Sequence, residues 1–172
     1  EYAYHLKLVE PGGSGFRDVT GLAQSVTWSG DARQIARTLS AGLAVPRDGS
    51  VEAPNLAEGA ALILEQAGKV RFTGQLTQCS TSSQTVVADL SALDGGRFLA
   101  GNEGFYRFDN VTPEAAVAAM CRDFGILTGT LAPTGISVRR KFPGVALYKS
   151  VTTLYTLAGE QTGKRYLPRI TG

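Results

Sequence analysis

The spacing of the apolar residues changes at Asp94-Gly95-Gly96, and this change limits the folds that the chain can adopt. Before it, apolar and polar residues alternate, as in residues 4–8 (YHLKL), which is typical of a strand with one buried face. After it, apolar residues recur every three to four positions, as in an amphipathic helix. We therefore expect an α+β protein that is mainly β, with an antiparallel, barrel-like domain over residues 1–94 and a small helix-containing α/β domain over residues 95–172.

Several segments of the first part are candidate strands. The clearest are residues 60–65 and 70–76, which flank a turn at residues 66–69 and together predict a β-hairpin. Residues 33–45 also allow a helix, but their later part alternates, and we expect a strand from about residue 37. Consecutive hairpins, with 21 glycines in the chain for tight turns, favour an antiparallel sheet that curls or closes into a barrel. The other candidate strands are residues 2–8, 26–29 and 85–90.

Two helices are expected in the second part, and both have recognisable end signals. The first covers residues 113–124, with Thr112 as its N-cap and proline at its first position. The second covers residues 146–161 and ends at a glycine, after which residues 164–170 predict a strand. The expected buried faces are Val117, Met120, Cys121 and Phe124 in the first helix and Leu147, Val151, Leu154, Tyr155 and Ala158 in the second.

Charge is distributed unevenly along the chain. The net charge is only +2, but residues 1–96 hold seven basic and ten acidic side chains, whereas residues 97–172 hold ten basic and five acidic ones. The densest basic cluster is Arg139-Arg140-Lys141, in a predicted loop between the two helices. Three interpretations of this cluster stay open: a solvated loop, a contact with an acidic protein and a contact with DNA. Sequence-specific nucleic-acid binding is not expected. The possible partner contact therefore consists of Arg139, Arg140 and Lys141.

The sequence contains no arrangement of residues that is typical of catalysis. The single histidine, His5, lies on the polar face of the first strand, and its sequence neighbours offer no acid partner, so no catalytic triad is expected. Ser14 lies in a glycine-rich loop that lacks the spacing of a nucleophile elbow. We therefore expect no catalytic residues and no enzyme activity in this chain. The only carboxylate pairs considered for general acid–base chemistry are Glu103 with Asp109 and Asp89 with Asp94, neither of which has a recognisable context.

The ligand spacings of common metal and cofactor sites are also absent from the sequence. No Cys-x-x-Cys, His-x-x-x-His or calcium-loop pattern occurs, so neither a metal nor a cofactor is expected. Cys79 and Cys121 are far apart in sequence and are interpreted as reduced, buried thiols. No apolar run approaches the ~20 residues that cross a bilayer, and no membrane partner is expected.

Eight short segments, taken in order, carry a resemblance to a known protein family. They are Val26-Thr27-Trp28-Ser29-Gly30-Asp31, the alternating residues 37–43, Val70-Arg71-Phe72-Thr73-Gly74, residues 94–99, Phe105-Tyr106-Arg107-Phe108, Asp123-Phe124-Gly125-Ile126, residues 144–148 and Thr162-Gly163-Lys164-Arg165-Tyr166. They span most of the chain, from about residue 19 to residue 166. In order and spacing they resemble the hub proteins of contractile phage tails known from PBSX-type prophages (XkdQ/YqbQ-like).

The resemblance implies a structural role in a tail particle. Hubs of this kind are trimers that join the tail tube to the spike and baseplate around a channel, and their β-barrels are similar to the tube subunit. The implied partners are the tail tube protein, the spike and the baseplate proteins, and the implied location is the virion or a tailocin particle after synthesis in the bacterial cytoplasm. The resemblance also places Trp28 in the core. Family members are about twice this long and the chain begins with Glu1, so we expect a fragment of a longer chain.

Two other functions stay open at this point. A tail-associated peptidoglycan hydrolase would need a nucleophile or a carboxylate pair in a cleft. A carbohydrate-binding or peptide-binding β-module would need exposed aromatic side chains. Neither feature is evident in the sequence, so a structural protein of the baseplate hub is the favoured hypothesis.

Overall fold

The computed structural model describes residues 3–30, 35–46, 52–81 and 86–170. The chain divides into two compact units, which are described separately below. Unit 1 consists of residues 1–96 and 170–172, and unit 2 consists of residues 97–169. That residues 1–94 and 95–172 fold as independent domains stays a prediction.

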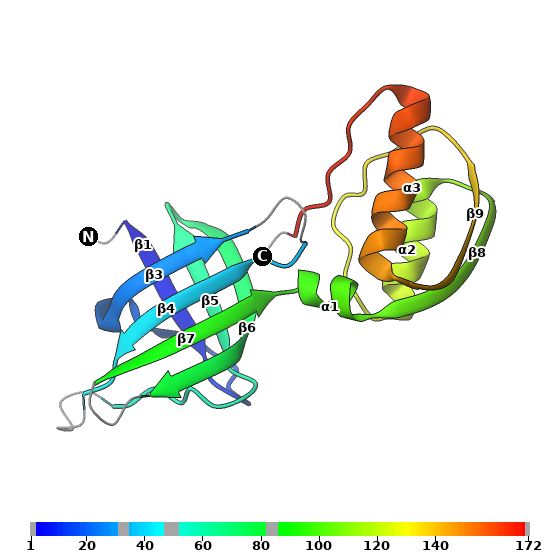
Figure 1. Ribbon diagram of the computed structural model, residues 1–172. Helices are drawn as coiled ribbons and strands as arrows, with labels where there is room; N and C mark the ends of the chain where they lie inside the picture. Colours follow the sequence, from blue (N-terminus) through cyan, green and yellow to red (C-terminus); the bar gives the residue numbers. More distant parts are fainter. Residues whose placement is uncertain (1–2, 31–34, 47–51, 82–85, 171–172) are drawn as a thin grey trace. The chain divides into compact units, whose positions relative to one another are not determined.

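Unit 1 is a seven-stranded sheet that curls strongly on itself (Figure 1). Every pair of neighbouring strands is antiparallel, and the strands follow the order β2-β1-β5-β6-β7-β4-β3. This confirms the prediction of a mainly β protein built on an antiparallel, barrel-like sheet. The strands are β1 (Tyr4–Val9), β2 (Arg17–Asp18), β3 (Ala23–Ser29), β4 (Thr38–Ala44), β5 (Ala61–Gln66), β6 (Lys69–Thr81) and β7 (Val87–Asp94).

The predicted hairpin is formed by β5 and β6. Gln66 pairs with Lys69, so the loop has only two residues, Ala67 and Gly68, with φ angles of 51° and 70°. Positive φ at both loop positions is typical of the type I′ turn, whose twist matches that of the flanking strands. The turn sets the register of the last two pairs, and a one-residue shift between Leu64 and Glu65 then pairs Leu64 with Phe72. With this shift Leu62, Leu64 and Phe72 are all buried.

The core of unit 1 fills the concave side of the curled sheet. Alternate side chains of β5, β7 and the first part of β6 are buried, which explains the alternation in the sequence. Gly74 is part of this packing, because a Cβ atom there would lie 2.5 Å from the ring of Phe72. The largest buried side chains are Leu6, Leu8, Leu39, Leu43, Leu62 and Phe72.

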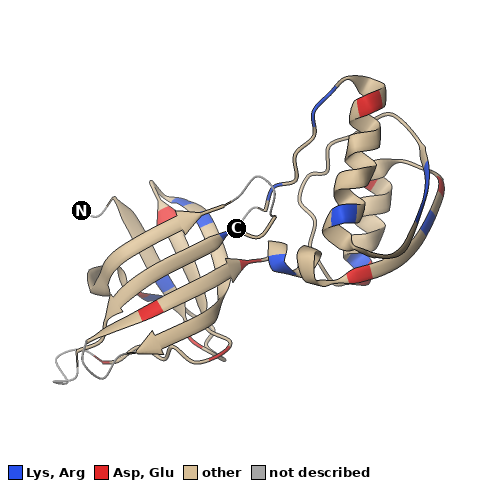
Figure 2. Cartoon of the chain, in the orientation of Figure 1, with Lys and Arg blue, Asp and Glu red and all other residues tan. Residues whose placement is uncertain are grey.

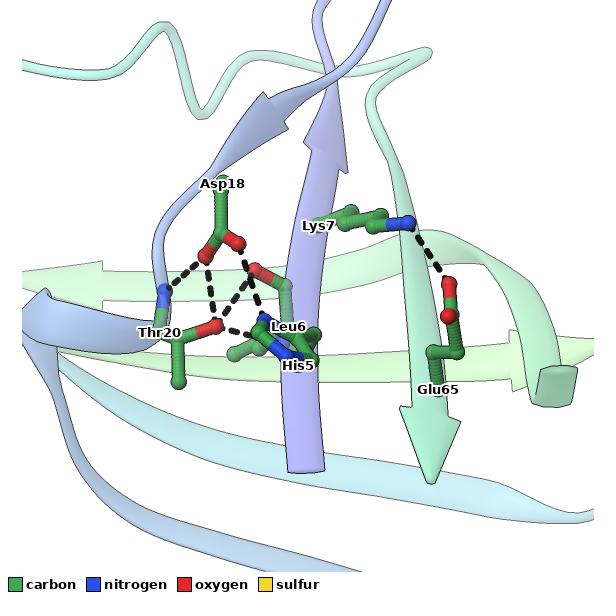
Figure 3. A network of polar contacts seen from close by, with 6 residues as sticks. All are labelled: His5, Leu6, Lys7, Asp18, Thr20 and Glu65. Carbon is green, nitrogen blue, oxygen red and sulfur yellow. Dashed lines mark hydrogen bonds and ion pairs between the residues drawn. The ribbon is translucent and has the colours of Figure 1, made fainter. Parts of the chain in front are cut away.

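A short polar network around Thr20 ties the segment after β2 to β1 (Figure 3). Beyond β2, the chain continues alongside β1: the N–H of Val19 donates to the carbonyl of Leu6 at 2.9 Å. The N–H of Leu6 in turn donates to Oγ1 of Thr20 at 2.8 Å. A side-chain hydroxyl therefore takes the place of a backbone acceptor, and residues 20–22 then lead directly into β3, the opposite edge of the sheet.

Asp18 holds the Thr20 side chain in position and also contacts His5. Its Oδ1 accepts hydrogen bonds from the Thr20 hydroxyl at 2.5 Å and from the Thr20 N–H at 2.9 Å. Its Oδ2 lies 3.1 Å from Nδ1 of His5. The hydrogen bond from the Thr20 hydroxyl is the main reason why the pKa of Asp18 lies below its usual value. The acid partner of His5 therefore comes from a different strand, and not from its sequence neighbours.

Unit 2 contains a two-stranded antiparallel ribbon and helices. Its elements are α1 (Gly96–Gly101), β8 (Glu103–Val111), α2 (Pro113–Asp123), β9 (Val138–Ala146) and α3 (Leu147–Thr162). The two long helices lie within a residue or two of their predicted ends. Thr112 caps α2 by accepting a hydrogen bond from the Ala115 N–H, and Gly163, with a φ angle of 70°, ends α3. The short α1 was not predicted.

Two segments of unit 2 differ from the sequence-based expectation. Residues 139–141 are part of β9 and not of a loop, because they pair with β8. The sequence of these three residues alone does not indicate that pairing. Residues 164–170 form no strand: within the described part of the chain, no neighbouring strand pairs with them.

Three side chains expected in the core are exposed instead. Phe124 is 38% exposed and lies just past the end of α2, at its C-cap. Trp28 is 42% exposed: it is registered against the buried Leu39, but β3 is the last strand of the sheet and no further strand covers it. Cys79 lies in the exposed second half of β6. Cys121, by contrast, is buried as predicted.

The first prediction concerns the hydrogen bonds at Thr20. Thr20→Val removes the acceptor of the Leu6 N–H, and leaving a buried donor unpaired costs about 1–3 kcal/mol of unfolding free energy. Thr20→Ser keeps the hydroxyl and should cost clearly less. Chemical denaturation of the two variants and the wild type measures both values, and equal stabilities for the valine and serine variants would contradict the role given to the hydroxyl.

The second prediction compares two positions of the predicted α2 stripe. Val117 is 3% exposed and Phe124 is 38% exposed, so Val117→Asp places an unpaired charge in the core and Phe124→Asp does not. We expect Val117→Asp to cost upward of about 3 kcal/mol and Phe124→Asp to cost far less. Thermal melts of both variants test this, and equal losses would show that both side chains are buried.

Candidate protein-binding surface

The β8–β9 ribbon carries the basic cluster that the sequence analysis singled out. Two β-bulges bracket the central part of this ribbon. At one bulge Pro143 and Gly144 face Phe105, and at the other Asp109 and Asn110 face Arg139. Gly144 and Asn110 have φ angles of 63° and 55°, the left-handed geometry often found in such bulges. Bulges increase local twist and redirect side chains, so they determine where the side chains between them point.

The inner face of the ribbon is an aromatic layer. Tyr106 stacks on Phe108 with 5.5 Å between ring centroids and 7° between planes, and Phe108 meets Phe142 edge-on at 6.3 Å. The hydroxyl of Tyr106 donates to Asp123 at the end of α2 at 3.1 Å. Gly104 is required beside Tyr106, because a Cβ atom there would come within 2.3 Å of the ring. This packing fixes the ribbon against the helical part of unit 2.

The outer face of the ribbon is basic. Arg107 of β8 is directly opposite Lys141 of β9, and both side chains are exposed. Like charges directly opposite each other on neighbouring strands are destabilising. Arg139 lies on the same face and forms an ion pair with Asp109, with Nε 2.7 Å from Oδ1. Figure 2 shows the Lys and Arg positions in blue along β8 and β9.

An open depression lies along this part of the ribbon. It is lined by Arg107, Phe108, Asp109, Arg139, Arg140 and Lys141, so four basic side chains surround one carboxylate. The single ion pair in this depression is exposed on both sides, at 82% for Arg139 and 46% for Asp109, and such surface pairs contribute little. The depression is therefore suited to an acidic group of another molecule.

The structure places two of the three predicted contact residues on the outer face, together with two residues that the sequence analysis did not include. Arg139 and Lys141 lie on the outer face, whereas Arg140 is registered against Phe108. Arg107 joins the cluster across the ribbon, and the exposed ring of Phe105 lies over Gly144, at 3.1 Å from the Cβ position there. Only the strand register could have indicated these two additions, and residues 139–141 gave no clear alternation from which to infer it.

The carboxylates considered for catalysis are engaged elsewhere. Glu103 and Asp109 are six residues apart on β8, roughly 20 Å at ~3.3 Å per residue, and glycosidase pairs need about 5–9.5 Å. Asp94 is buried and accepts hydrogen bonds from the N–H and the Nε of Arg37, at 3.1 and 2.9 Å. Asp89 is exposed on the other face of β7. Neither pair therefore forms an acid–base site.

Metal-binding clusters and membrane-spanning helices are absent from the described ranges. No three His, Cys, Asp or Glu side chains gather there closely enough to hold a metal ion. Among the described residues, no helix is long and apolar enough to cross a membrane.

Comparison with known proteins identifies the family. The model of the YQBQ-like family matches residues 26–171, which is most of the chain. The chain belongs to the YQBQ-like family. This confirms the resemblance to XkdQ/YqbQ-type phage proteins.

Two curated proteins of Bacillus subtilis (strain 168) are similar to this YQBQ-like chain. The phage-like element PBSX protein XkdQ is 26% identical over 152 residues, and the uncharacterized protein YqbQ is 24% identical over 152 residues. Both matches cover 84% of this chain but 44% of the relative. The chain thus spans less than half the length of the curated relatives it matches.

Two solved structures share the fold. One is the tail protein from Neisseria meningitidis MC58, with a TM-score of 0.69 and 16% identity, covering 99% of this chain and 48% of that one. The other is the 43 kDa tail protein of prophage MuSo2 from Shewanella oneidensis, with a TM-score of 0.66 and 17% identity, covering 90% and 48%. At these identities the likeness establishes the fold.

The third prediction follows from the opposed cations on the ribbon. Arg107→Glu should stabilise the free protein by about 0.2–1 kcal/mol, because a cross-strand ion pair with Lys141 replaces a repulsion. In the Lys141→Glu background the same substitution should destabilise, because two carboxylates then face each other. A double-mutant cycle by chemical denaturation measures the coupling, and a coupling of zero would show that the two side chains do not interact.

Proposed function

We propose that the chain is part of the baseplate hub protein of a contractile phage tail or tailocin, which joins the tail tube to the spike and baseplate. The observation that carries the proposal is the YQBQ-like match over residues 26–171, together with a relative named as a protein of the phage-like element PBSX. The folds of two tail proteins, which this chain shares, support a structural role in a tail particle. In this proposal the chain acts by binding other tail proteins and performs no catalysis.

The architecture of unit 1 is compatible with assembly through strands. β3 is an edge strand whose sequence, AQSVTWS, has no charged residue and no proline. Most of its side chains are exposed, including Trp28. Monomeric proteins commonly protect such edges with lysine, proline or short strands, whereas an unprotected edge can pair with a strand of a neighbour. The unprotected edge of β3 therefore supports the proposal that the chain forms contacts with other subunits.

The fourth prediction concerns the oligomeric state. We expect the full-length parent to be a trimer and the present chain to be monomeric or only weakly associated, because a small interface does not offset the ~4–15 kcal/mol cost of association. Light scattering coupled to size-exclusion chromatography gives both masses. Binding to purified tube and spike proteins is measured alongside.

The same measurements can refute the hub proposal. A full-length parent that stays monomeric at assembly concentrations and binds neither tube nor spike protein would overturn it. Tail particles purified from an induced lysogen provide a second check, because the parent should be present in them at a fixed ratio to the spike. Absence of the parent from intact particles would also overturn the hub proposal.

A further inference from the structure

We propose that the outer face of the β8–β9 ribbon is a docking surface for an acidic surface of a neighbouring tail protein. The basic ribbon face, as we call it, consists of Phe105, Arg107, Asp109, Arg139 and Lys141. The inference rests on the proposed function, since it assumes that the chain is incorporated into a tail. Beyond the proposed function, it names the surface that makes one of the contacts and states that the partner presents acidic side chains there.

The first argument is an unbalanced charge on a fixed support. Arg107 and Lys141 are held opposite each other by the strand register, and no acidic side chain pairs with either of them among the described residues. The aromatic layer beneath them and the hydrogen bond from Tyr106 to Asp123 hold the ribbon in place. A repulsion that is built into a rigid surface is relieved when a carboxylate of another molecule lies between the two cations.

The second argument is the position of the bulges. They interrupt the ladder on both sides of the Arg107–Lys141 pair, at the left-handed residues Asn110 and Gly144. Bulges often occur where a strand directs a side chain toward a functional surface. Here they isolate a short, regular segment whose outward side chains are these two cations.

The third argument favours a protein partner over DNA. Phe105 is 82% exposed on this face, and exposed aromatic side chains beside arginines are typical of the centres of protein interfaces. Asp109 places a carboxylate among the cations, where it would repel a phosphate backbone. Proteins that bind DNA through charge commonly neutralise many phosphates, and the depression here offers four cations, one of which is already paired with Asp109.

The test uses charge reversal in the full-length parent within a tail-producing lysogen. The test variant is Arg107→Glu with Lys141→Glu, and the matched control is Lys149→Glu with Arg165→Glu, which changes the net charge equally at exposed positions of unit 2 outside this face. A third variant, Arg107→Lys with Lys141→Arg, keeps both charges. Circular dichroism and melting of the purified proteins establish that each variant is folded.

We expect that the parent is incorporated into tails only when this face keeps its positive charge. The test variant should be reduced at least about tenfold in purified tails, while the control and the charge-retaining variant incorporate normally. In binding assays with the isolated partner proteins, the affinity of the wild type should fall with rising salt, and the test variant should lose most of that salt dependence. Normal incorporation of a folded test variant would overturn the docking surface.

The design separates failure of this inference from failure of the hub proposal. If the wild type is present in tails and the test variant is present in equal amount, the surface is refuted and the hub proposal stands. If the wild type is absent from intact tails, both fall. A gel-shift assay with duplex DNA tests the alternative that this face binds DNA. If the test variant loses DNA binding while its binding to partner proteins is unchanged, the face binds nucleic acid and the proposed protein partner is refuted.

Discussion

The β1 edge of unit 1 depends on the hydrogen bonds that Thr20 makes there. β2 is only two residues long, so the backbone alone provides little pairing at this edge of the sheet. The Thr20 hydroxyl continues the pairing by accepting from the Leu6 N–H, and Asp18 orients that hydroxyl. This side chain thus holds the chain against β1 just before residues 20–22 lead into β3, beside the fully buried Leu6 and Val19.

A second polar anchor lies where β7 ends. The carboxylate of Asp94 is buried and accepts hydrogen bonds from the backbone and the side chain of Arg37 and from the Gly96 N–H. A buried charge of this kind is tolerated only when it is paired and hydrogen-bonded. Arg37 also donates to the carbonyl of Ile170, which is how the distant C-terminal segment becomes part of unit 1. Its guanidinium lies over the ring of Trp28, at 5.4 Å from the centroid, on the exposed edge strand.

The two units provide surfaces of different chemistry for assembly. In unit 1 the edge strand β3 has uncharged side chains, and on its outer side no strand of the described residues pairs with it. In unit 2 the basic ribbon face presents cations and one aromatic ring on a support fixed by bulges. Each feature reduces the stability or the protection of the free chain, since an open edge invites pairing and opposed cations repel. The proposed function accounts for these costs, because neighbours in a tail particle would satisfy both features.

The sequence by itself determined the elements whose signals are local. Alternation predicted the strands and the mainly β fold, the turn residues predicted the β5–β6 hairpin, and Thr112 predicted the start of α2, because each depends on neighbours within a few positions. Only the tertiary structure decided what depends on distant partners. Four features follow from the pairing of strands far apart in sequence. Residues 139–141 are a strand, and Arg107 and Phe105 join the outer face of the ribbon. His5 pairs with Asp18, and Trp28 is exposed at a sheet edge. Register, and not composition, therefore built the candidate surface.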